Sequence, residues 1–281
     1  MTHRRSMESH PSGRSTSDSG SPPMTKAFVI LGDPIAQARS PGVFNRLFRK
    51  RRVDAVMTPM LVSAEYFEKA LSDLRAVDNM AGLVITVPHK VAAARLMKMG
   101  SRRATLAMAA NALGPCQDGW EGDLFDGEGF VRGMVEGRTV AGARCALVGC
   151  GGAGAAISFA LLEAGVKSLS LWGIDPRKAE TLGDRLRAAY GWEISIAPPD
   201  MTTDVAINAT PLGMKSDDPL PIDVVSLRRN AIVADAIMKP PLTRLLMEAR
   251  RCGCGIHAGR HMLDHQVESI WSFFGLPRPE P

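Results

Sequence analysis

The chain of 281 residues is long enough for two domains with buried cores, and its hydrophobic content of 45% is that of a globular protein. The formal net charge is +5, but much of the basic excess lies near the N-terminus and in residues 49–52, and no nucleic-acid-binding motif is present. No apolar run is long enough to span a membrane. We therefore expect neither nucleic acid nor a membrane as a partner.

Residues 1–24 are rich in Ser, Gly, Pro, His and Arg, which predicts a disordered tail. This tail lacks the apolar core of a secretory signal. Three of the five cysteines lie in or beside apolar stretches, which favours free thiols in a reducing compartment over a disulfide framework. We therefore expect a cytoplasmic protein.

The first half of the chain predicts alternating strands and helices. Buried strands are expected over residues 27–31, 56–61 and 82–87, and helices over 40–52, from 63 onward and over 102–110. Ser40 and Ser63 are the expected N-caps. The alternation predicts parallel strands with ligands at their carboxyl ends, where Thr86, His89 and Lys90 lie. The glycine- and acid-rich segment 120–129 is the expected domain boundary.

A glycine motif opens the second half. An apolar strand over residues 145–148 is followed by Gly149, Gly151 and Gly154 in the spacing G-x-G-x-x-G, and then by a helix over residues 155–164. Strand, glycine turn and helix are together typical of a dinucleotide site, in which the backbone and the helix N-terminus bind a pyrophosphate. The alternative is a glycine-rich turn without a ligand.

The rest of the second half continues the same pattern. Further strands are expected over residues 169–172, 193–196, 205–207 and 232–234, with helices over 176–189, 242–249 and 262–274. Asp175 follows the second of the five strands, where an acidic side chain would meet the ribose hydroxyls of a bound cofactor. It is equally suited to cap the helix that begins at Pro176, and the two roles are compatible.

Six segments together resemble the shikimate and quinate dehydrogenase family, over residues 28–275. Residues 32–41 (GDPIAQARSP) are similar to the family's G-x-P-I-x-H-S-x-S-P, and residues 82–90 (GLVITVPHK) to its G-x-N-V-T-x-P-x-K. Residues 107–113 (AMAANAL) resemble G-A-V-N-T-L, and residues 124–130 (LFDGEGF) resemble N-T-D-G-x-G-F. Residues 207–214 (INATPLGM) and 259–266 (GRHMLDHQ) complete the resemblance.

The resemblance implies an α/β fold of two αβ domains with the active site in the cleft between them. Residues 25–125 and 259–281 would form the substrate domain, and residues 126–258 a Rossmann-like NAD(P)-binding domain. The implied activity is oxidation of a secondary alcohol on a shikimate- or quinate-like cyclic hydroxy acid, with NAD or NADP as cofactor. The protein would act as a monomer or homodimer.

The resemblance also implies the roles of individual residues. Lys90 and Asp126 would handle the hydroxyl proton as the catalytic pair. The substrate would be bound by Ser40, Thr86, Asn111 and Gln266. The cofactor would be bound by Gly149, Gly151, Gly152, Ala153, Gly154, Asp175, Asn208, Thr210 and Gly259.

Several positions depart from the family pattern. Gln37 and Ala38 replace His and Ser, Val84 replaces Asn, Leu124 and Phe125 replace Asn-Thr, and Met238 replaces Tyr. Each change removes a polar group from or near the expected cleft, so we expect shikimate and quinate to bind weakly. A different small hydroxy acid, or a dinucleotide-binding regulatory protein without turnover, are the alternatives.

The residues that follow the predicted strand at 169–172 bear on the choice between NAD and NADP. Gly173-Ile174-Asp175 stands where NADP-preferring members have Asn-Arg-Thr, which favours NAD, although Arg177 and Lys178 follow closely.

Cysteines and histidines gather near the C-terminus, at Cys252, Cys254, His257, His261 and His265. Their spacing matches no zinc motif, so a metal site is an alternative and we expect no metal.

Overall fold

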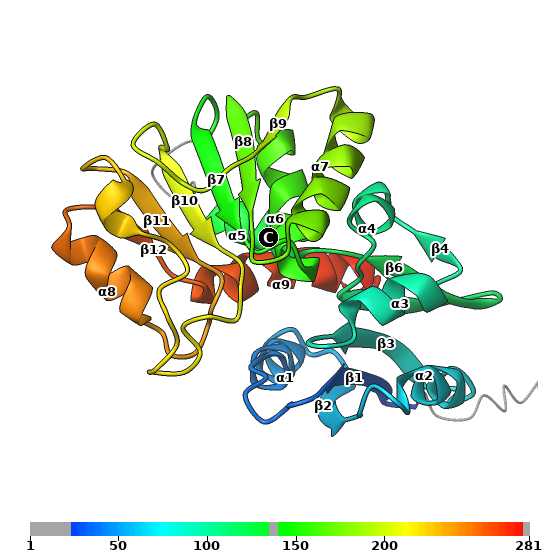
Figure 1. Cartoon of the computed structure of the whole chain (residues 1–281). Helices are drawn as coiled ribbons and strands as arrows, with labels where there is room; N and C mark the ends of the chain where they lie inside the picture. The colour runs from blue at the N-terminus through cyan, green and yellow to red at the C-terminus, as the bar shows by residue number, and fades with distance from the viewer. Residues whose placement is uncertain (1–23, 135–139, 278–281) are drawn as a thin grey trace, which may run out of the picture.

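The computed structural model describes residues 24–134 and 140–277, which form two six-stranded sheets with helices on both faces of each (Figure 1). All of the tail expected over residues 1–24 except Met24 lies outside the described residues, as do residues 278–281. None of the helices in the described part of the chain combines the length and the apolar character needed to cross a membrane.

The first sheet has the strand order β2-β1-β3-β5-β6-β4. Its strands are β1 (Lys26–Gly32), β2 (Ala55–Leu61), β3 (Met80–Ile85), β4 (Met99–Gly100), β5 (Ala112–Cys116) and β6 (Gly119–Asp123). Strands β1, β2 and β3 are parallel as expected, but β5 runs antiparallel to both β3 and β6. The parallel arrangement expected for these three strands is therefore confirmed, and β5 and β6, which were not expected, add a tight hairpin to the sheet.

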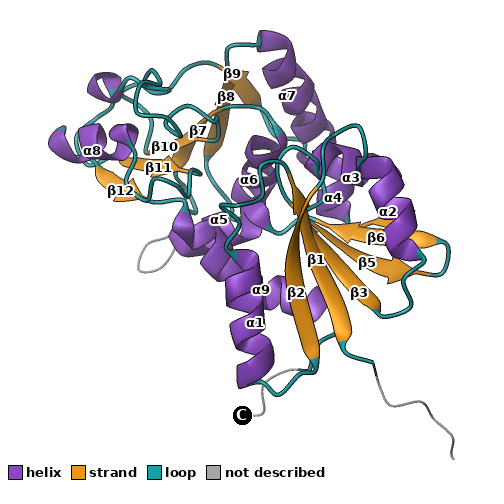
Figure 2. Ribbon diagram, turned by 90° about the horizontal axis from the view of Figure 1, so that it is seen from below, coloured by secondary structure: helices purple, strands orange, loops and turns teal. Residues whose placement is uncertain are grey.

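Helices cover both faces of the first sheet. These are α1 (Ser40–Lys50), α2 (Phe67–Arg75), α3 (Lys90–Leu96), α4 (Arg102–Ala107) and α9 (Arg260–Phe273). Because side chains alternate along a strand, Phe28 and Ile30 of β1 pack with α1 and α9, whereas Val29 and Leu31 pack with α2 and α3. Figure 2 shows α1 and α9 on one side of the fan of strands and α2 and α3 on the other.

Several expected helix caps and boundaries differ from the structure by a few residues. The carbonyl of Arg39 accepts the first helical hydrogen bond, so Arg39 is the N-cap of α1 and Ser40 is its first residue. Ser63 accepts a turn hydrogen bond from the amide of Tyr66, and α2 begins only after Tyr66. Helix α4 ends at Ala107, since Met108 adopts a left-handed conformation with φ of 52°.

The second sheet is fully parallel, with the order β12-β11-β10-β7-β8-β9. Its strands are β7 (Arg144–Val148), β8 (Ser168–Trp172), β9 (Ile194–Ile196), β10 (Val205–Asn208), β11 (Ile232–Asp235) and β12 (Gly255–His257). The first five lie where the sequence predicts strands. Strand β12 was not expected, because its sequence GIH contains a single aliphatic residue and so carries no hydrophobic pattern.

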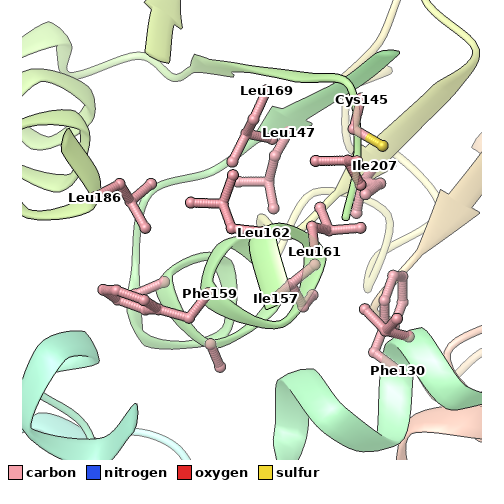
Figure 3. Packing of buried hydrophobic residues seen from close by; sticks show 14 of the residues in the cluster. Phe130, Cys145, Leu147, Ile157, Phe159, Leu161, Leu162, Leu169, Leu186 and Ile207 are labelled. Atoms are coloured by element: carbon pink, nitrogen blue, oxygen red, sulfur yellow. The ribbon is translucent and has the colours of Figure 1, made fainter. Parts of the chain in front are cut away.

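One face of this sheet is covered by α6 (Gly152–Glu163) and α7 (Pro176–Tyr190), and the other by α8 (Arg244–Arg251) and the 3₁₀ helix Val224–Ser226. Helix α6 is apolar all round and buried along most of its length. Figure 3 shows why: Leu147 and Leu169 of the sheet pack near Leu162, while Phe130 approaches from a separate helix. Helix α6 is therefore a central element of the core.

The helix that carries Phe130 is α5 (Asp126–Met134), which lies with α9 between the two sheets (Figure 1). A Cβ at Gly127 would collide with the carbonyl of Ala156 in α6, and one at Gly129 with the carbonyl of Met262 in α9. The glycines of segment 120–129 thus let α5 pack against two helices at backbone distance. This segment comprises most of β6 and the first turn of α5.

Candidate active site

Lys90 and Asp126 meet at the junction of the two sheets. Lys90 is the first residue of α3, just past the carboxyl end of β3, and Asp126 is the first residue of α5. Lys90 Nζ donates a hydrogen bond of 2.6 Å to Asp126 Oδ2. Only 16% of the lysine side chain and 4% of the aspartate side chain are exposed. A charge-assisted hydrogen bond this short, largely removed from water, fixes the two groups in one geometry.

A second polar pair lies behind the first. Asn111 Nδ2 donates to Gln266 Oε1 of α9 at 2.8 Å, and Asn111 Oδ1 accepts from the amide of Phe125 at 2.8 Å. Asn111 and Gln266 are both buried. Because Phe125 immediately precedes Asp126, Asn111 holds the start of α5 in place relative to α9.

The other expected substrate residues lie at the carboxyl ends of β1 and β3. The amide of Thr86 donates to the carbonyl of Leu31 at 2.9 Å, and Ser40 is buried in the first turn of α1. His89 belongs to the core instead. Its ring stacks on Phe67 at 4.3 Å, and Nε2 lies 2.7 Å from the carbonyl of Val62, so it is not a cleft residue.

The glycine loop between β7 and α6 has the geometry of a phosphate cradle. Gly149 has a φ of +106°, and a Cβ at Gly154 would collide with the carbonyl of Gly149, so both positions require glycine. A Cβ at Gly151 would meet no atom within 4 Å, and one at Gly152 would lie 4.0 Å from Lys90 Cβ. Helix α6 begins at Gly152 rather than at residue 155, so Gly152, Ala153 and Gly154 form its first turn. Their backbone N–H groups have no partners within the helix.

Asn208 and Thr210 shape the neighbouring loop. Asn208 Oδ1 accepts from the amide of Thr210 at 3.0 Å and from its hydroxyl at 2.7 Å. Asn208 Nδ2 donates to Asp235 Oδ1 at 3.1 Å. A Cβ at Gly149 would lie 2.7 Å from Thr210 Cγ2, so this loop and the glycine loop are in contact. Gly259 is equally confined, since its Cβ would lie 2.5 Å from the carbonyl of Ile237.

Asp235 was not expected in this region. It is fully buried, and it also accepts hydrogen bonds from Thr243 Oγ1 at 2.6 Å and from the amide of Ile237 at 3.0 Å. Burial raises the pKa of Asp235 above its ordinary value, and these hydrogen bonds offset only part of the effect. This role does not follow from the residues around Asp235 alone, because one partner, Asn208, comes from the neighbouring strand β10.

Asp175 is the N-cap of α7, as one of its two expected roles requires. Its Oδ1 accepts from the amide of Arg177 at 3.1 Å. Asp175 follows the end of β8, the strand that pairs with β7, and Arg177 and Lys178 are exposed beside it. The geometry is therefore compatible with both a capping role and contact with a cofactor ribose.

Three positions that depart from the family pattern, Ala38, Val84 and Leu124, lie among apolar side chains in the structure. Ala38 and Val84 pack in the cluster that includes Phe44 and Phe125. Leu124, expected near the cleft, instead packs in the core around α6 and lines a cavity of about 340 Å³ with Phe159. The expectation that Leu124 faces the substrate is therefore wrong.

The metal-site alternative is not supported. The rings of His257 and His261 stack at 4.8 Å, and those of His261 and His265 at 6.0 Å, which is an arrangement of packed aromatic rings. Within residues 24–134 and 140–277, no group of His, Cys, Asp and Glu is arranged to hold a metal ion. Burial, together with the charges of His261 and His265, lowers the pKa of His257 to about 4.

Comparison with known proteins identifies the family. Residues 30–113 match the model of the shikimate dehydrogenase substrate binding domain. A shikimate dehydrogenase (NADP(+)) of Rhodospirillum rubrum is 34% identical over 247 residues, which cover 84% of this chain and 87% of the relative. The chain belongs to the shikimate dehydrogenase family. The resemblance and the α/β fold class expected from the sequence are confirmed.

Solved members of the shikimate dehydrogenase family share the fold. The shikimate 5-dehydrogenase of Listeria monocytogenes in complex with shikimate and NAD has a TM-score of 0.79 and 25% identity, and covers 89% of this chain and 92% of its own. The quinate dehydrogenase of Corynebacterium glutamicum in complex with NAD has a TM-score of 0.78 and 27% identity, with coverages of 90% and 94%.

Proposed function

We propose that this protein is an NAD(P)-dependent dehydrogenase that interconverts a shikimate- or quinate-like cyclic hydroxy acid and its ketone. For shikimate the reaction is shikimate + NAD(P)⁺ = 3-dehydroshikimate + NAD(P)H. The observation that carries the proposal is the Lys90–Asp126 ion pair beside Gly152 of the glycine loop. It brings a proton-handling pair to the edge of a dinucleotide cradle.

Oxidation of a secondary alcohol removes a hydride from carbon and a proton from oxygen. A bound nicotinamide cofactor supplies the hydride acceptor. Lys90 Nζ meets the substrate hydroxyl, and its hydrogen bond to Asp126 Oδ2 allows the pair to take up one proton as a unit. In the reducing direction the Lys90 ammonium returns that proton to the carbonyl oxygen.

The substrate-binding residues come from the first sheet and α9. We assign residues 25–125 and 259–281 to the substrate domain and residues 126–258 to the cofactor domain, which is supported by the packing of α9 on β1 and α1. Ser40 and Thr86 hold the substrate from the strand ends. Asn111 and Gln266 hold it from the opposite side, where their shared hydrogen bond orients both amides.

The open space at Gly151 and the free first turn of α6, which begins at Gly152, fit a pyrophosphate. Gly149, Ala153 and Gly154 complete this cradle, and Asn208, Thr210 and Gly259 shape its walls. Asp175 favours NAD, because a carboxylate bonds a ribose diol and repels the 2′-phosphate of NADP. Both cofactors occur in the names and complexes of the relatives above.

The substrate has fewer polar partners here than the family pattern provides. Ala38 cannot donate to a carboxylate, and Val84 cannot bond a ring hydroxyl. We therefore propose weak binding of shikimate and quinate, and tighter binding of a cyclic hydroxy acid with fewer hydroxyls. The five free cysteines support a reducing, cytoplasmic setting, and we assign a monomer or homodimer without nucleic-acid or membrane partners.

The test is turnover of a panel of cyclic hydroxy acids with NAD⁺ and with NADP⁺, followed by the absorbance of the reduced cofactor. The panel contains shikimate, quinate and analogues that lack single ring hydroxyls. We expect turnover that disappears in Lys90→Ala. Cofactor binding without turnover of any member would contradict the proposal and favour a regulatory protein.

A further inference from the structure

Arg103 of α4 forms a polar network on both sides of Asp126. Arg103 Nε and Nη2 donate to the two carboxylate oxygens of Asp123 at 2.7 and 2.8 Å, and Nη1 donates to Glu128 Oε2 at 2.5 Å. The guanidinium also lies over the ring of Phe125, 4.4 Å from its centroid. Asp123, Phe125 and Glu128 all lie within three residues of Asp126.

The network extends from Arg103 to other elements. Ser269 Oγ of α9 donates to Glu128 Oε1 at 2.9 Å, and Asp123 Oδ1 also accepts from the amide of Leu124 at 2.6 Å. The arginine side chain is only 28% exposed, and its carboxylate partners are 13% and 20% exposed. A bidentate guanidinium in such a site makes geometrically specific contacts that a point charge cannot reproduce.

The backbone around Asp126 is consequently held from two directions. Asn111 binds the amide of Phe125, while Arg103 covers the Phe125 ring and bridges the two carboxylates that flank Asp126. Asp126 itself contacts Lys90 and not Arg103. Any displacement of this segment would change the 2.6 Å hydrogen bond of the Lys90–Asp126 pair.

We propose that Arg103 is a positioning residue that fixes the Asp126 carboxylate against Lys90 by bridging Asp123 and Glu128 and by stacking on Phe125. The effect on turnover rests on the proposed function, whereas the effect on the Lys90–Asp126 contact does not. Phe125, which replaces a Thr of the family pattern, thereby supplies the surface on which the guanidinium packs.

The first test is a double-mutant cycle. Arg103→Met should lower kcat by about 10–100-fold, because small misplacements of a catalytic group cost this much. In an Asp126→Asn background the same change should lower kcat by no more than about twofold, since the group through which Arg103 acts is already lost. An equal loss in both backgrounds would overturn the proposal and leave Arg103 a purely structural residue.

The second test needs no substrate. Acetylation of Lys90 by acetic anhydride is measured by peptide mass spectrometry, with Lys69 as the internal reference. Acetylation needs access to Lys90 Nζ, which is largely buried and held in the 2.6 Å hydrogen bond to Asp126 Oδ2, so loosening of that contact should increase its reaction. Arg103→Met should raise Lys90 labelling to a level comparable with that of Asp126→Asn. Labelling equal to that of the unchanged protein would overturn the proposal even if no cyclic hydroxy acid is turned over.

Arg132→Met is the matched control. Arg132 Nη2 also pairs with Glu128, at 2.8 Å, but this arginine is 57% exposed and contacts neither Asp123 nor Phe125. It should change neither kcat nor Lys90 labelling. If Arg103→Met unfolds, Arg103→Lys replaces it, because it keeps a charge between the carboxylates but loses the bidentate contact and the stacking. The results expected for Arg103→Met, and those that would overturn the proposal, then apply to Arg103→Lys.

Discussion

Gly152 of the glycine loop faces Lys90 at the junction of the two sheets. A Cβ at residue 152 would lie 4.0 Å from Lys90 Cβ and 3.8 Å from Ala109 Cβ. The first turn of α6 therefore begins one side-chain width from the residue proposed to handle the hydroxyl proton. The chain thus places the proposed proton-transfer residue and the proposed cofactor loop on adjoining elements, although they are far apart in sequence.

Lys90→Ala should lower kcat by about two to four orders of magnitude, the usual range for a general acid–base group, while cofactor affinity stays nearly unchanged. The reason is that Lys90 lies beside the cradle without being part of it. Steady-state kinetics and cofactor titration measure the two effects. Lys69→Ala, an exposed lysine of α2, should have no effect. A near-normal kcat for Lys90→Ala would show that another group handles the proton.

Asp175→Ala should raise the KM for NAD more than the KM for NADP, because the lost carboxylate bonds one cofactor and repels the other. The change also removes the N-cap of α7, which costs about 1 kcal/mol of stability. Asp175→Ser separates the roles, since serine caps helices well but carries no charge. It should reproduce the KM shift at unchanged stability. Equal KM changes for both cofactors would reduce Asp175 to a helix cap.

Ala38→Ser should lower the KM for shikimate by about 10- to 100-fold with little change in kcat, because a hydrogen bond to a charged group contributes about 1.5–3 kcal/mol. The added hydroxyl would restore a donor near Ser40. Ala36→Ser, an exposed position in the same loop, is the matched control. No response of the KM to Ala38→Ser would mean that the carboxylate is held elsewhere.

The free energy of unfolding should fall as the pH is lowered from 7 to 4. The pKa of His257 is about 4 in the folded protein and about 6.5 in the unfolded chain, so the unfolded state binds more protons in this range. The loss should reach about 3 kcal/mol. Urea titrations of the protein and of His257→Phe measure it, and the variant should show a weaker pH dependence. Parallel curves would assign the pH dependence to other groups.

The sequence predicts the parallel strands well because each is a short apolar run followed by a turn or helix start. Strands β5 and β6 carry no such run, since their sequences are ALGPC and GWEGD. The usable signal there was Asp118-Gly119, a dipeptide typical of hairpin turns. Strand β12 offers no signal of its own and forms only because β11 provides its partner.

Some residues of the candidate site could be predicted from the sequence, and others could not. Family motifs locate Lys90 and Asp126, and the structure brings their side chains to 2.6 Å. Arg103 lies outside every motif, and its partners Asp123 and Glu128 come from a segment that only folding brings to it. Asp235 likewise acquires its partner Asn208 from another strand. Apolar replacements such as Leu124 could not be placed from sequence, because the direction of a side chain at the end of β6 depends on how α5 packs.

Helix α9 follows every strand of the second sheet in the chain, yet it completes the core of the first. Trp271 packs against Phe48 at 5.6 Å, and Phe274, just beyond the helix, against Phe28 at 5.0 Å. During translation the N-terminal strands therefore leave the ribosome long before the helix that covers them is made. Until then Phe28 of β1 and Phe48 of α1 lack the cover that Phe274 and Trp271 provide, so a chain stalled before Arg260 would be an aggregation-prone client for chaperones.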